Sequence, residues 1–421
     1  MKPERILFVC HGHPELVPGG TELFAHDLFR AIRDEGHAQT MFLGCVSRLH
    51  RPARAEIGFQ AIGRSRDELL LWVGGFDRFM LGHTDTAPFV QSLTELLTSF
   101  KPDVVHFHHF AMIGLEALAL TRRVLPQARI VATLHDYHPI CANDGLMVTT
   151  DGALCERAGP DACHACLPDM TQSRFAARAL HMRNMLQLVD RFVAPSRFLK
   201  ERFVAWGLAA DRIDVIANGV PELASKPAAA SKRPPRTFGV FGSIAPHKGT
   251  LHALAAITRV AAEVSGAALR LHGGMNFPND AFRRNFETTL CEAGEAATHG
   301  GPYRREALPG LMADLDWVVV PSTWWENAPL VILEAFRHKR PVICSGIGGM
   351  AELVTDGVNG LHVRTGDVAA LARAMRRAAE EDGLWERLVA GIPSVPTVAD
   401  TVKHHLTLYS ELLERRGARI A

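Results

Sequence analysis

The sequence predicts an α/β protein made of two Rossmann-like domains, and three observations lead to this fold class. The chain has 421 residues, about twice the length of an ordinary domain. Its composition, 47% hydrophobic and 22% charged residues, is sufficient for large cores. Runs rich in β-formers alternate with amphipathic helical runs, the order typical of parallel sheets covered by helices. Because such sheets bind ligands at the carboxyl ends of their strands, we expect two domains facing each other across a cleft that holds the site.

Residues 1–221 form the first expected domain. Short apolar runs predict its strands, and apolar positions spaced at 3.6 residues predict its helices. The expected strands are 5–10, 39–43, 103–107 and 129–134, and the expected helices include 22–34 and 88–100.

A linker and a second domain follow. Residues 222–236, ELASKPAAASKRPPR, combine prolines and small residues and cannot form a core element. The alternation resumes in a second domain, 237–397. Its expected strands are 237–241, 268–272, 317–320 and 341–344. The last segment, 398–421, is expected to be a helix that packs back on the first domain, because Leu406, Tyr409 and Leu413 share one helical face.

The charge of the chain argues against nucleic acid as a partner. Forty-six basic residues balance 45 acidic ones, a net charge of +1, whereas duplex-binding proteins carry a basic excess. The N-terminal stretch MKPERILFVC has a strand-length apolar run rather than a signal-peptide core, and no uncharged apolar run reaches membrane-spanning length. The expected location is the cytoplasm, with peripheral contact at the inner face of the membrane left open.

Two glutamates stand in an otherwise apolar segment, PSTWWENAPLVILEA (321–335). It follows the expected strand 317–320, so Glu326 falls in a loop at the carboxyl end of that strand. Glu334 falls about one and a half turns inside the next helix. The alternative is that both are ordinary solvated glutamates.

The start of that helix is a candidate anion site. Pro329 is expected in its first turn, where a missing N–H costs nothing, with Asn327 or Ala328 as the cap. The amides around Ala328 and Leu330, helped by the helix dipole, would suit a nucleotide diphosphate. A ribose diol would then suit Glu334, and a sugar hydroxyl would suit Glu326.

The segment 321–335 resembles the E-x7-E motif of retaining GT-B glycosyltransferases, specifically glycosyltransferase family 4. Three further segments are similar to that family in the expected order: VAPSRFLK (193–200), IANGV (216–220) and GIGGMAELVTDGVNGLHV (346–363). The resemblance covers nearly the whole chain. It implies that Glu326 contacts the transferred sugar and that Glu334 contacts the nucleotide ribose. It also implies a nucleotide-diphosphate sugar donor and transfer with retention.

The stretch FGSIAPHKG (241–249) lies between an expected strand and a helix beginning near Thr250. Gly242 lets the backbone approach a ligand, and Lys248 can bring positive charge to a leaving diphosphate. The family often has arginine where this chain has Ser243, so Lys248 is expected to carry more of the phosphate charge. The D-x-D at 314–316 precedes a strand, away from the ligand edge, so no catalytic metal is expected.

Glycines and histidines follow the early strands. In HGHPELVPGGTE (11–22), Gly20 precedes a helix whose cap is expected to be Thr21, and the resemblance implies that this loop approaches the donor. The resemblance also favours His135, after the strand in VATLHDYH, as the histidine facing the sugar. His108 and His109, in VVHFHHF, are acceptor-side candidates. Each histidine could instead simply hydrogen-bond a neighbouring loop.

Four cysteines fall in the loop 141–166. Cys163 and Cys166 have C-x2-C spacing, and with Cys141 and Cys155 they could hold a structural zinc ion. Reduced thiols, a disulfide outside the cytosol or an iron–sulfur cluster are the alternatives.

These observations predict a metal-independent, hexosyltransferase-like enzyme with a saccharide, lipid-linked or small-molecule acceptor, for example in bacterial surface polysaccharide or glycoconjugate synthesis. The apolar, charged stretch 68–81 suits either a lipid-linked acceptor or core packing. The alternatives are a nucleotide-sugar epimerase on the same fold and a non-catalytic metal-binding scaffold.

Overall fold

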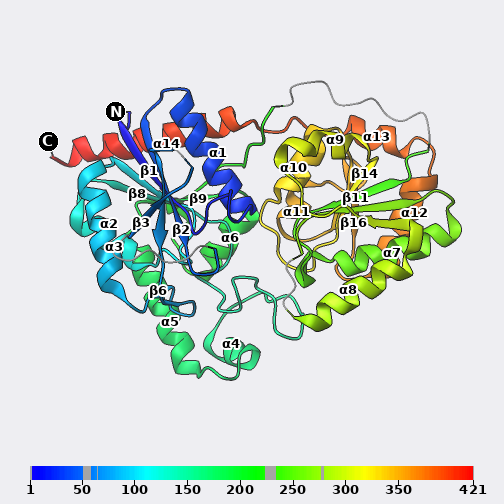
Figure 1. The fold of residues 1–421 in the computed structure, drawn as a ribbon, viewed down its shortest axis with the longest axis horizontal. Helices are drawn as coiled ribbons and strands as arrows, with labels where there is room; N and C mark the ends of the chain where they lie inside the picture. The colour runs from blue at the N-terminus through cyan, green and yellow to red at the C-terminus, as the bar shows by residue number, and fades with distance from the viewer. Residues whose placement is uncertain (1, 51–57, 64, 223–233, 276–278, 421) are drawn as a thin grey trace. The chain divides into compact units, whose positions relative to one another are not determined.

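The computed structural model describes residues 2–50, 58–63, 65–222, 234–275 and 279–420, with side chains to residue 415. The chain forms two compact α/β units, the first made of Met1–Gly219 and Thr397–Ala421 and the second of Val220–Pro396 (Figure 1). Most of the expected linker 222–236 lies outside the described residues.

The first unit contains a sheet with strand order β10-β9-β8-β7-β1-β2-β4-β3. All neighbours are parallel except β3 and β4. The order reverses between β1 and β7, a topological switch point where doubly wound folds bind ligands. The strands of the sheet are β1 (Arg5–Val9), β2 (Gln39–Val46), β3 (Phe59–Ala61), β4 (Glu68–Trp72), β7 (Val104–Phe107), β8 (Arg129–Thr133), β9 (Arg191–Ala194) and β10 (Ile213–Val215), and a separate ribbon contains β5 (Phe76–Asp77) and β6 (Gly82–His83). The helices are α1 (Gly20–Asp34), α2 (Thr86–Phe100), α3 (Glu116–Val124), α4 (Pro160–Cys166), α5 (Gln172–Leu186), α6 (Arg197–Trp206) and α14 (Val398–Ile420).

The second unit contains a parallel sheet with strand order β13-β12-β11-β14-β15-β16. Numbered within the unit this order is 3-2-1-4-5-6, the Rossmann arrangement, with its switch point between β11 and β14. The strands are β11 (Thr237–Phe241), β12 (Ala268–His272), β13 (Ala297–His299), β14 (Trp317–Val320), β15 (Val342–Ser345) and β16 (Gly360–Val363). The helices are α7 (Thr250–Glu263), α8 (Asp280–Glu292), α9 (Leu308–Ala313), α10 (Leu330–Arg337), α11 (Gly348–Leu353), α12 (Val368–Glu380) and α13 (Leu384–Ala390).

Helices cover both faces of these sheets, so their central strands are buried on both sides. Every residue of β7, β11, β14 and β15 is buried, which explains why these strands are short apolar runs rather than alternating patterns. The prediction of an α/β fold with two Rossmann-like domains is confirmed. The strands β11, β12 and β14 have the predicted bounds.

The last helix, α14, packs on the first unit. It contacts α1 (Figure 1). Tyr409 and Leu413 join a core cluster with Ile6 and Phe8, and Leu406 is half-buried beside that cluster. The Tyr409 hydroxyl lies 2.6 Å from Nδ1 of the buried His106 on β7. The shared face seen in the sequence is therefore a packing face.

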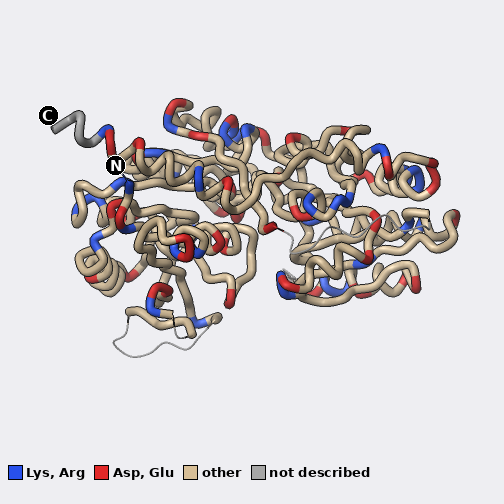
Figure 2. Tube along the Cα trace, turned by 90° about the horizontal axis from the view of Figure 1, so that it is seen from above, with Lys and Arg blue, Asp and Glu red and all other residues tan. Residues whose placement is uncertain are grey.

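Acidic and basic residues are interspersed along the backbone of both units (Figure 2). Within the described ranges, no helix is both long and apolar enough to cross a membrane.

Candidate active site

Two loops meet at the switch point of the second unit, one after β11 and one after β14. Gly242 opens the first loop with φ +112°, a conformation that side-chain-bearing residues rarely adopt. Gly249 ends it with φ +70°, and a Cβ there would lie 2.0 Å from the carbonyl oxygen of Pro321. Glycine therefore permits the close approach of the two loops.

An ion pair joins the two loops. Nζ of Lys248 donates to Oε1 of Glu326 at 2.7 Å, and the Ser322 hydroxyl donates to the same oxygen at 2.8 Å. Burial alone would raise the pKa of the Glu326 carboxyl, but the charge and hydrogen bond of Lys248 outweigh it and hold the pKa below its usual value. Lys248 also lies 5.0 Å from the centre of the Trp324 ring. The pair is thus an ionised carboxylate and a cation whose side chain is 31% exposed.

The loop with Glu326 is supported by the start of α11. The backbone N–H of Gly349 donates to the Glu326 carbonyl at 2.7 Å, and a Cβ on Gly349 would lie 1.7 Å from the carbonyl oxygen of the buried Asn327. The glycine-rich segment identified in the sequence therefore positions Glu326 through its backbone. Ser243 lies half-buried beside Gly242 in the first loop.

The start of α10 differs from the prediction. The helix begins at Leu330, and Pro329 is its cap, with ψ 119°. The expectation that Pro329 lies in the first turn with Asn327 or Ala328 as cap is therefore wrong. Neither the cap nor the first helical position needs its backbone N–H for a hydrogen bond within the helix. Proline, which lacks this N–H, therefore fits both positions, and sequence alone does not separate them.

Glu334 is half-buried on α10. Burial, followed by the negative charge of Glu334, raises the pKa of Tyr303. Tyr303 packs edge-on against Phe241, the last residue of β11, at 5.6 Å between ring centroids. Glu334 therefore lies near the ligand edge of this sheet rather than on a fully exposed helix face.

The switch point of the first unit holds histidines. Nδ1 of His108 lies 3.1 Å from Nε2 of His135. His108 is fully buried, so it can act on a ligand only through His135. Burial lowers the pKa of His135 to about 3, which keeps its imidazole neutral.

A second contact joins His109 to Asp136. The backbone N–H of Ala111 donates to Nδ1 of His109 at 2.8 Å, so the proton of the neutral ring lies on Nε2, which donates to Asp136 Oδ2. Burial lowers the pKa of His109 to about 4. Nδ1 of His138 lies 2.9 Å from the same carboxylate oxygen.

His11 and Glu22 complete this edge, and the sequence prediction missed both, as it missed Asp136 and His138. Nε2 of His11 lies 2.9 Å from Oε1 of Glu22, and its ring lies 4.1 Å from that of His109. Burial disfavours the charged ring, but the carboxylate of Glu22 outweighs it and raises the pKa of His11 well above its usual value. His11 follows the strand β1 in the same way that His109 and His135 follow β7 and β8. The rule that points to strand-end histidines could therefore have found His11 as well.

Gly20 lies at the same edge as the first residue of α1, and the cap is Gly19 rather than Thr21. A Cβ on Gly19 would lie 2.4 Å from Oε2 of Glu22. The carboxylate of Glu22 thus takes the space beside the cap that a side chain would fill.

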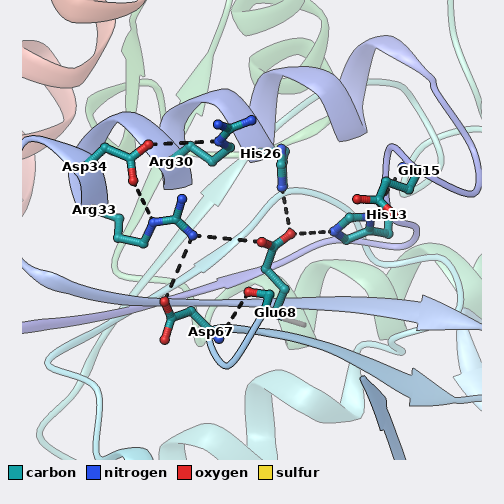
Figure 3. Close-up of polar contacts among 9 residues, drawn as sticks. His13, Glu15, His26, Arg30, Arg33, Asp34, Asp67 and Glu68 are labelled. Carbon is teal, nitrogen blue, oxygen red and sulfur yellow. Dashed lines mark hydrogen bonds and ion pairs between the residues drawn. The ribbon is translucent and has the colours of Figure 1, made fainter. Parts of the chain in front are cut away.

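Two clusters in the described part of the chain bring three metal-type ligand atoms within 4.8 Å of one another. One is His109, Asp136 and His138. The other is His13, His26 and Glu68, where both Nε2 atoms lie 2.8 Å from Oε2 of Glu68 (Figure 3). In each cluster a backbone N–H faces Nδ1 of one histidine, at 2.8 Å for His109 and 3.3 Å for His13. The neutral ring of that histidine carries its proton on Nε2, which faces the carboxylate and so has no lone pair for a metal ion. The geometry therefore fits histidines hydrogen-bonded to a shared carboxylate better than metal ligation.

The four loop cysteines are half-buried, and within the described residues they do not form such a compact cluster. Burial raises the pKa of Cys141 to about 11, with smaller contributions from Cys155 and Cys163. Arg178 is buried nearby, and burial lowers its pKa to about 10, whereas Cys141 and Cys163 act in the opposite direction. Cys141 and Cys163 therefore lie close enough to Arg178 to interact with it electrostatically.

Two family models match the chain in succession. Residues 18–222 match the model "Glycosyltransferase Family 4", and residues 235–381 match "Glycosyl transferases group 1". A glycogen synthase of Mycobacterium tuberculosis is 25% identical over 401 residues, covering 91% of this chain and 88% of the relative. A D-inositol 3-phosphate glycosyltransferase of Nocardioides sp. is 27% identical over 310 residues, 69% of this chain and 62% of the relative.

Solved structures share the fold over nearly the whole chain. HepE of Anabaena, solved with UDP and glucose, superposes with a TM-score of 0.68 at 18% identity and covers 97% of this chain and 100% of its own. Sucrose-phosphate synthase of Thermosynechococcus elongatus gives a TM-score of 0.70 at 18% identity, with coverages of 98% and 100%.

The two Rossmann-like units and these matches define the class of protein as a glycosyltransferase with the GT-B fold. Within this class, the chain combines a first part that matches the family 4 model with a second part that matches the group 1 model.

Proposed function

We propose that this glycosyltransferase moves a sugar from a nucleotide-diphosphate donor to an acceptor hydroxyl with retention of configuration. The observation that carries this proposal is the Lys248–Glu326 pair at the switch point of a Rossmann sheet. The names of the relatives and the UDP in the HepE structure agree with a nucleotide-sugar donor.

In this proposal the donor diphosphate separates the ion pair. The phosphates attract Lys248, which is the more exposed partner, and the backbone amide of Leu330 at the start of α10 adds a hydrogen-bond donor. Glu326 then becomes available to the transferred sugar, where its negative charge stabilises positive charge developing at the anomeric carbon. Ser243, Asn327 and Ala328 line the donor loops, and Glu334 binds the ribose diol.

The acceptor hydroxyl attacks the anomeric carbon from the same face from which the phosphate departs. The departing phosphate takes the proton of that hydroxyl. Glu326 is held by Lys248 and Ser322 rather than presented as a nucleophile, so no covalent glycosyl-enzyme step is assigned. Lysine and helix amides replace a catalytic metal. His135 and His109 face the acceptor side, His108 supports His135, and the Gly20 loop approaches the donor.

A structural zinc ion held by Cys141, Cys155, Cys163 and Cys166 is part of the proposal. Four thiolates on Zn²⁺ would carry net negative charge, and the buried guanidinium of Arg178 would compensate part of it. The ion would close the loop after β8 without taking part in transfer. We place the enzyme in the cytoplasm, with the acceptor a saccharide, lipid-linked or small molecule used in surface polysaccharide or glycoconjugate synthesis.

A donor panel tests this function. Purified protein is incubated with UDP-, GDP- and ADP-sugars, with and without an acceptor mixture, and nucleotide release is measured. Acceptor-dependent release and an NMR spectrum in which donor and product share the anomeric configuration are expected. Inversion would disprove retention, and a rearranged sugar formed from donor alone would establish an epimerase instead.

A further inference from the structure

A cavity of about 590 Å³ lies within the first unit, beside the cysteine-rich loop. Three loops that follow the carboxyl ends of β4, β7 and β8 contribute to its lining. Residues 166–170, just before α5, close another side. The volume is in the range of small-molecule sites, and the position is the ligand edge of this sheet.

The walls of the cavity are held by a buried arginine. Arg178 on α5 is 3% exposed and donates to the Phe79 carbonyl at 2.7 Å and the Pro139 carbonyl at 2.9 Å, as well as to the carbonyl of His138. One guanidinium thus joins the lining segments after β4 and β8. Burying a cation for this purpose is costly, and the multiple charge-assisted bonds to carbonyls offset that cost. The cavity is therefore pre-formed.

The lining combines apolar surface with few charges. Its larger apolar side chains are Phe76, Phe79, Leu81, Met112, Leu167 and Met170. The charged ones are Arg78, Asp144 and Asp169, and Arg78 is already paired with Asp144 at 2.8 Å. No excess positive charge remains among these residues, so a phosphate group would gain little attraction and would face Asp169.

His138 links one side of the cavity to the histidines of the switch point through Asp136. His138 lines the cavity and lies 2.9 Å from Asp136, which accepts the hydrogen bond of His109. A molecule in the cavity would therefore lie beside the groups assigned above to the acceptor side.

We propose that this cavity binds the acceptor, and that the acceptor is an uncharged, hydroxylated molecule with an apolar face, such as a glycoside, rather than a phosphorylated sugar or cyclitol. The phenylalanine rings would cover the apolar face, while His138 and Asp169 would bind hydroxyls. Since this assignment of the ligand rests on the transferase activity proposed above, its test includes binding without turnover.

The binding test adds phenyl β-glucoside or glucose 6-phosphate to the full chain in the absence of donor. Saturation-transfer NMR measures the binding of each probe. Phenyl glucoside should bind, Phe76→Ala should weaken it about 10-fold or more, and glucose 6-phosphate should bind more weakly than phenyl glucoside. Phe198→Ala is the matched control, because Phe198, like Phe76, is a half-buried phenylalanine of the first unit, but it does not line the cavity.

The kinetic test compares neutral and phosphorylated acceptors in matched pairs. Phe76→Ala should raise the acceptor KM about 10-fold while nucleotide affinity and donor hydrolysis without acceptor stay unchanged. Equal effects of Phe76→Ala and Phe198→Ala, or a preference for the phosphorylated partner, would overturn the assignment. If no donor is turned over but phenyl glucoside still binds in a Phe76-dependent way, the cavity stands as a glycoside site and the proposed transfer fails.

Discussion

The two switch points have the same topology and opposite chemistry. In the second unit, glycine turns bring one cation and one carboxylate together, Lys248 and Glu326. In the first unit, the neutral imidazole of His109 hydrogen-bonds to the carboxylate of Asp136, and those of His108 and His135 hydrogen-bond to each other. The difference follows from burial, because a buried histidine loses its charge readily while a lysine beside a carboxylate keeps it.

This contrast indicates a division of labour. A partly exposed cation suits an incoming diphosphate, whereas neutral histidines can accept hydrogen bonds from a hydroxyl and donate hydrogen bonds to it without competing for phosphate. His11 is the exception in the first unit, since Glu22 holds it in the charged form. Substitutions in each unit can test this division of labour.

The largest expected effect is at Lys248. Lys248→Ala removes the cation proposed to stabilise the leaving phosphate, so kcat/KM should fall about 100- to 1000-fold. It also leaves the buried Glu326 without its partner, so the melting temperature should fall. Steady-state kinetics and thermal unfolding measure both effects. Lys248→Arg keeps the charge and should recover part of the activity, and unchanged kinetics in Lys248→Ala would remove Lys248 from the donor site.

The next effect separates the two glutamates. Glu334→Gln should weaken donor and free-nucleotide binding by roughly 1.5–3 kcal/mol, because the variant loses the charged acceptor proposed to bind the ribose. Glu326→Gln should lower turnover and leave nucleotide affinity nearly unchanged, because its contact matters as the sugar becomes positively charged. Titration of free nucleotide into both variants, with parallel kinetics, distinguishes the roles. Equal losses of nucleotide binding would contradict the division between them.

The cysteine loop should affect stability more than nucleotide binding. Protein purified without added metal should contain one zinc per chain by elemental analysis, and Cys163→Ser with Cys166→Ser should remove it and lower the melting temperature. Nucleotide affinity should stay unchanged, because these residues belong to the first unit. Cys291→Ser, an exposed cysteine of the second unit, is the control. Reduced, folded protein without metal would disprove the zinc site.

A smaller effect should appear in the pH dependence of stability. The folded pKa of His109 is about 4, below the usual 6.5, so the unfolded chain binds more protons between these values. The contribution of His109 to the free energy of unfolding is therefore fully present above about pH 6.5 and decreases as the pH falls towards 4. His109→Gln should reduce this acid-side loss, giving a difference in melting temperature of about 2–4 °C. If the melting temperatures of the variant and the wild type change equally from pH 7 to pH 4, the assignment of His109 as a neutral imidazole is contradicted.

The smallest expected effect is that of removing free divalent cations. In the proposed mechanism Lys248 and helix amides take the place of a metal, so transfer should continue in excess EDTA at about the same rate, as nucleotide release would measure. Loss of activity that Mg²⁺ or Mn²⁺ restores, with the fold intact by circular dichroism, would place the phosphate charge on a metal instead.

The comparison between sequence and structure shows where local signals suffice. The bounds of β11, β12 and β14 follow from the sequence because each strand is a short, largely apolar run bounded by turn residues. The starts of α1 and α10 do not, because glycine and proline near a helix start are tolerated at several neighbouring positions. Motifs in the sequence predict Lys248, Glu326 and Glu334 as candidate site residues, but they do not predict that Lys248 pairs with Glu326.

The sequence by itself determined the α/β class, the strand-end placement of the candidate residues and the amphipathic face of α14, since each depends on patterns within a few residues. The tertiary structure alone decided that Lys248 meets Glu326 across 78 positions of sequence, that His109 rests on Asp136, and that Arg178 holds the wall of a cavity. Such contacts depend on the order of strands in the sheet. That order is set by the packing of whole layers, which no local period in the sequence records.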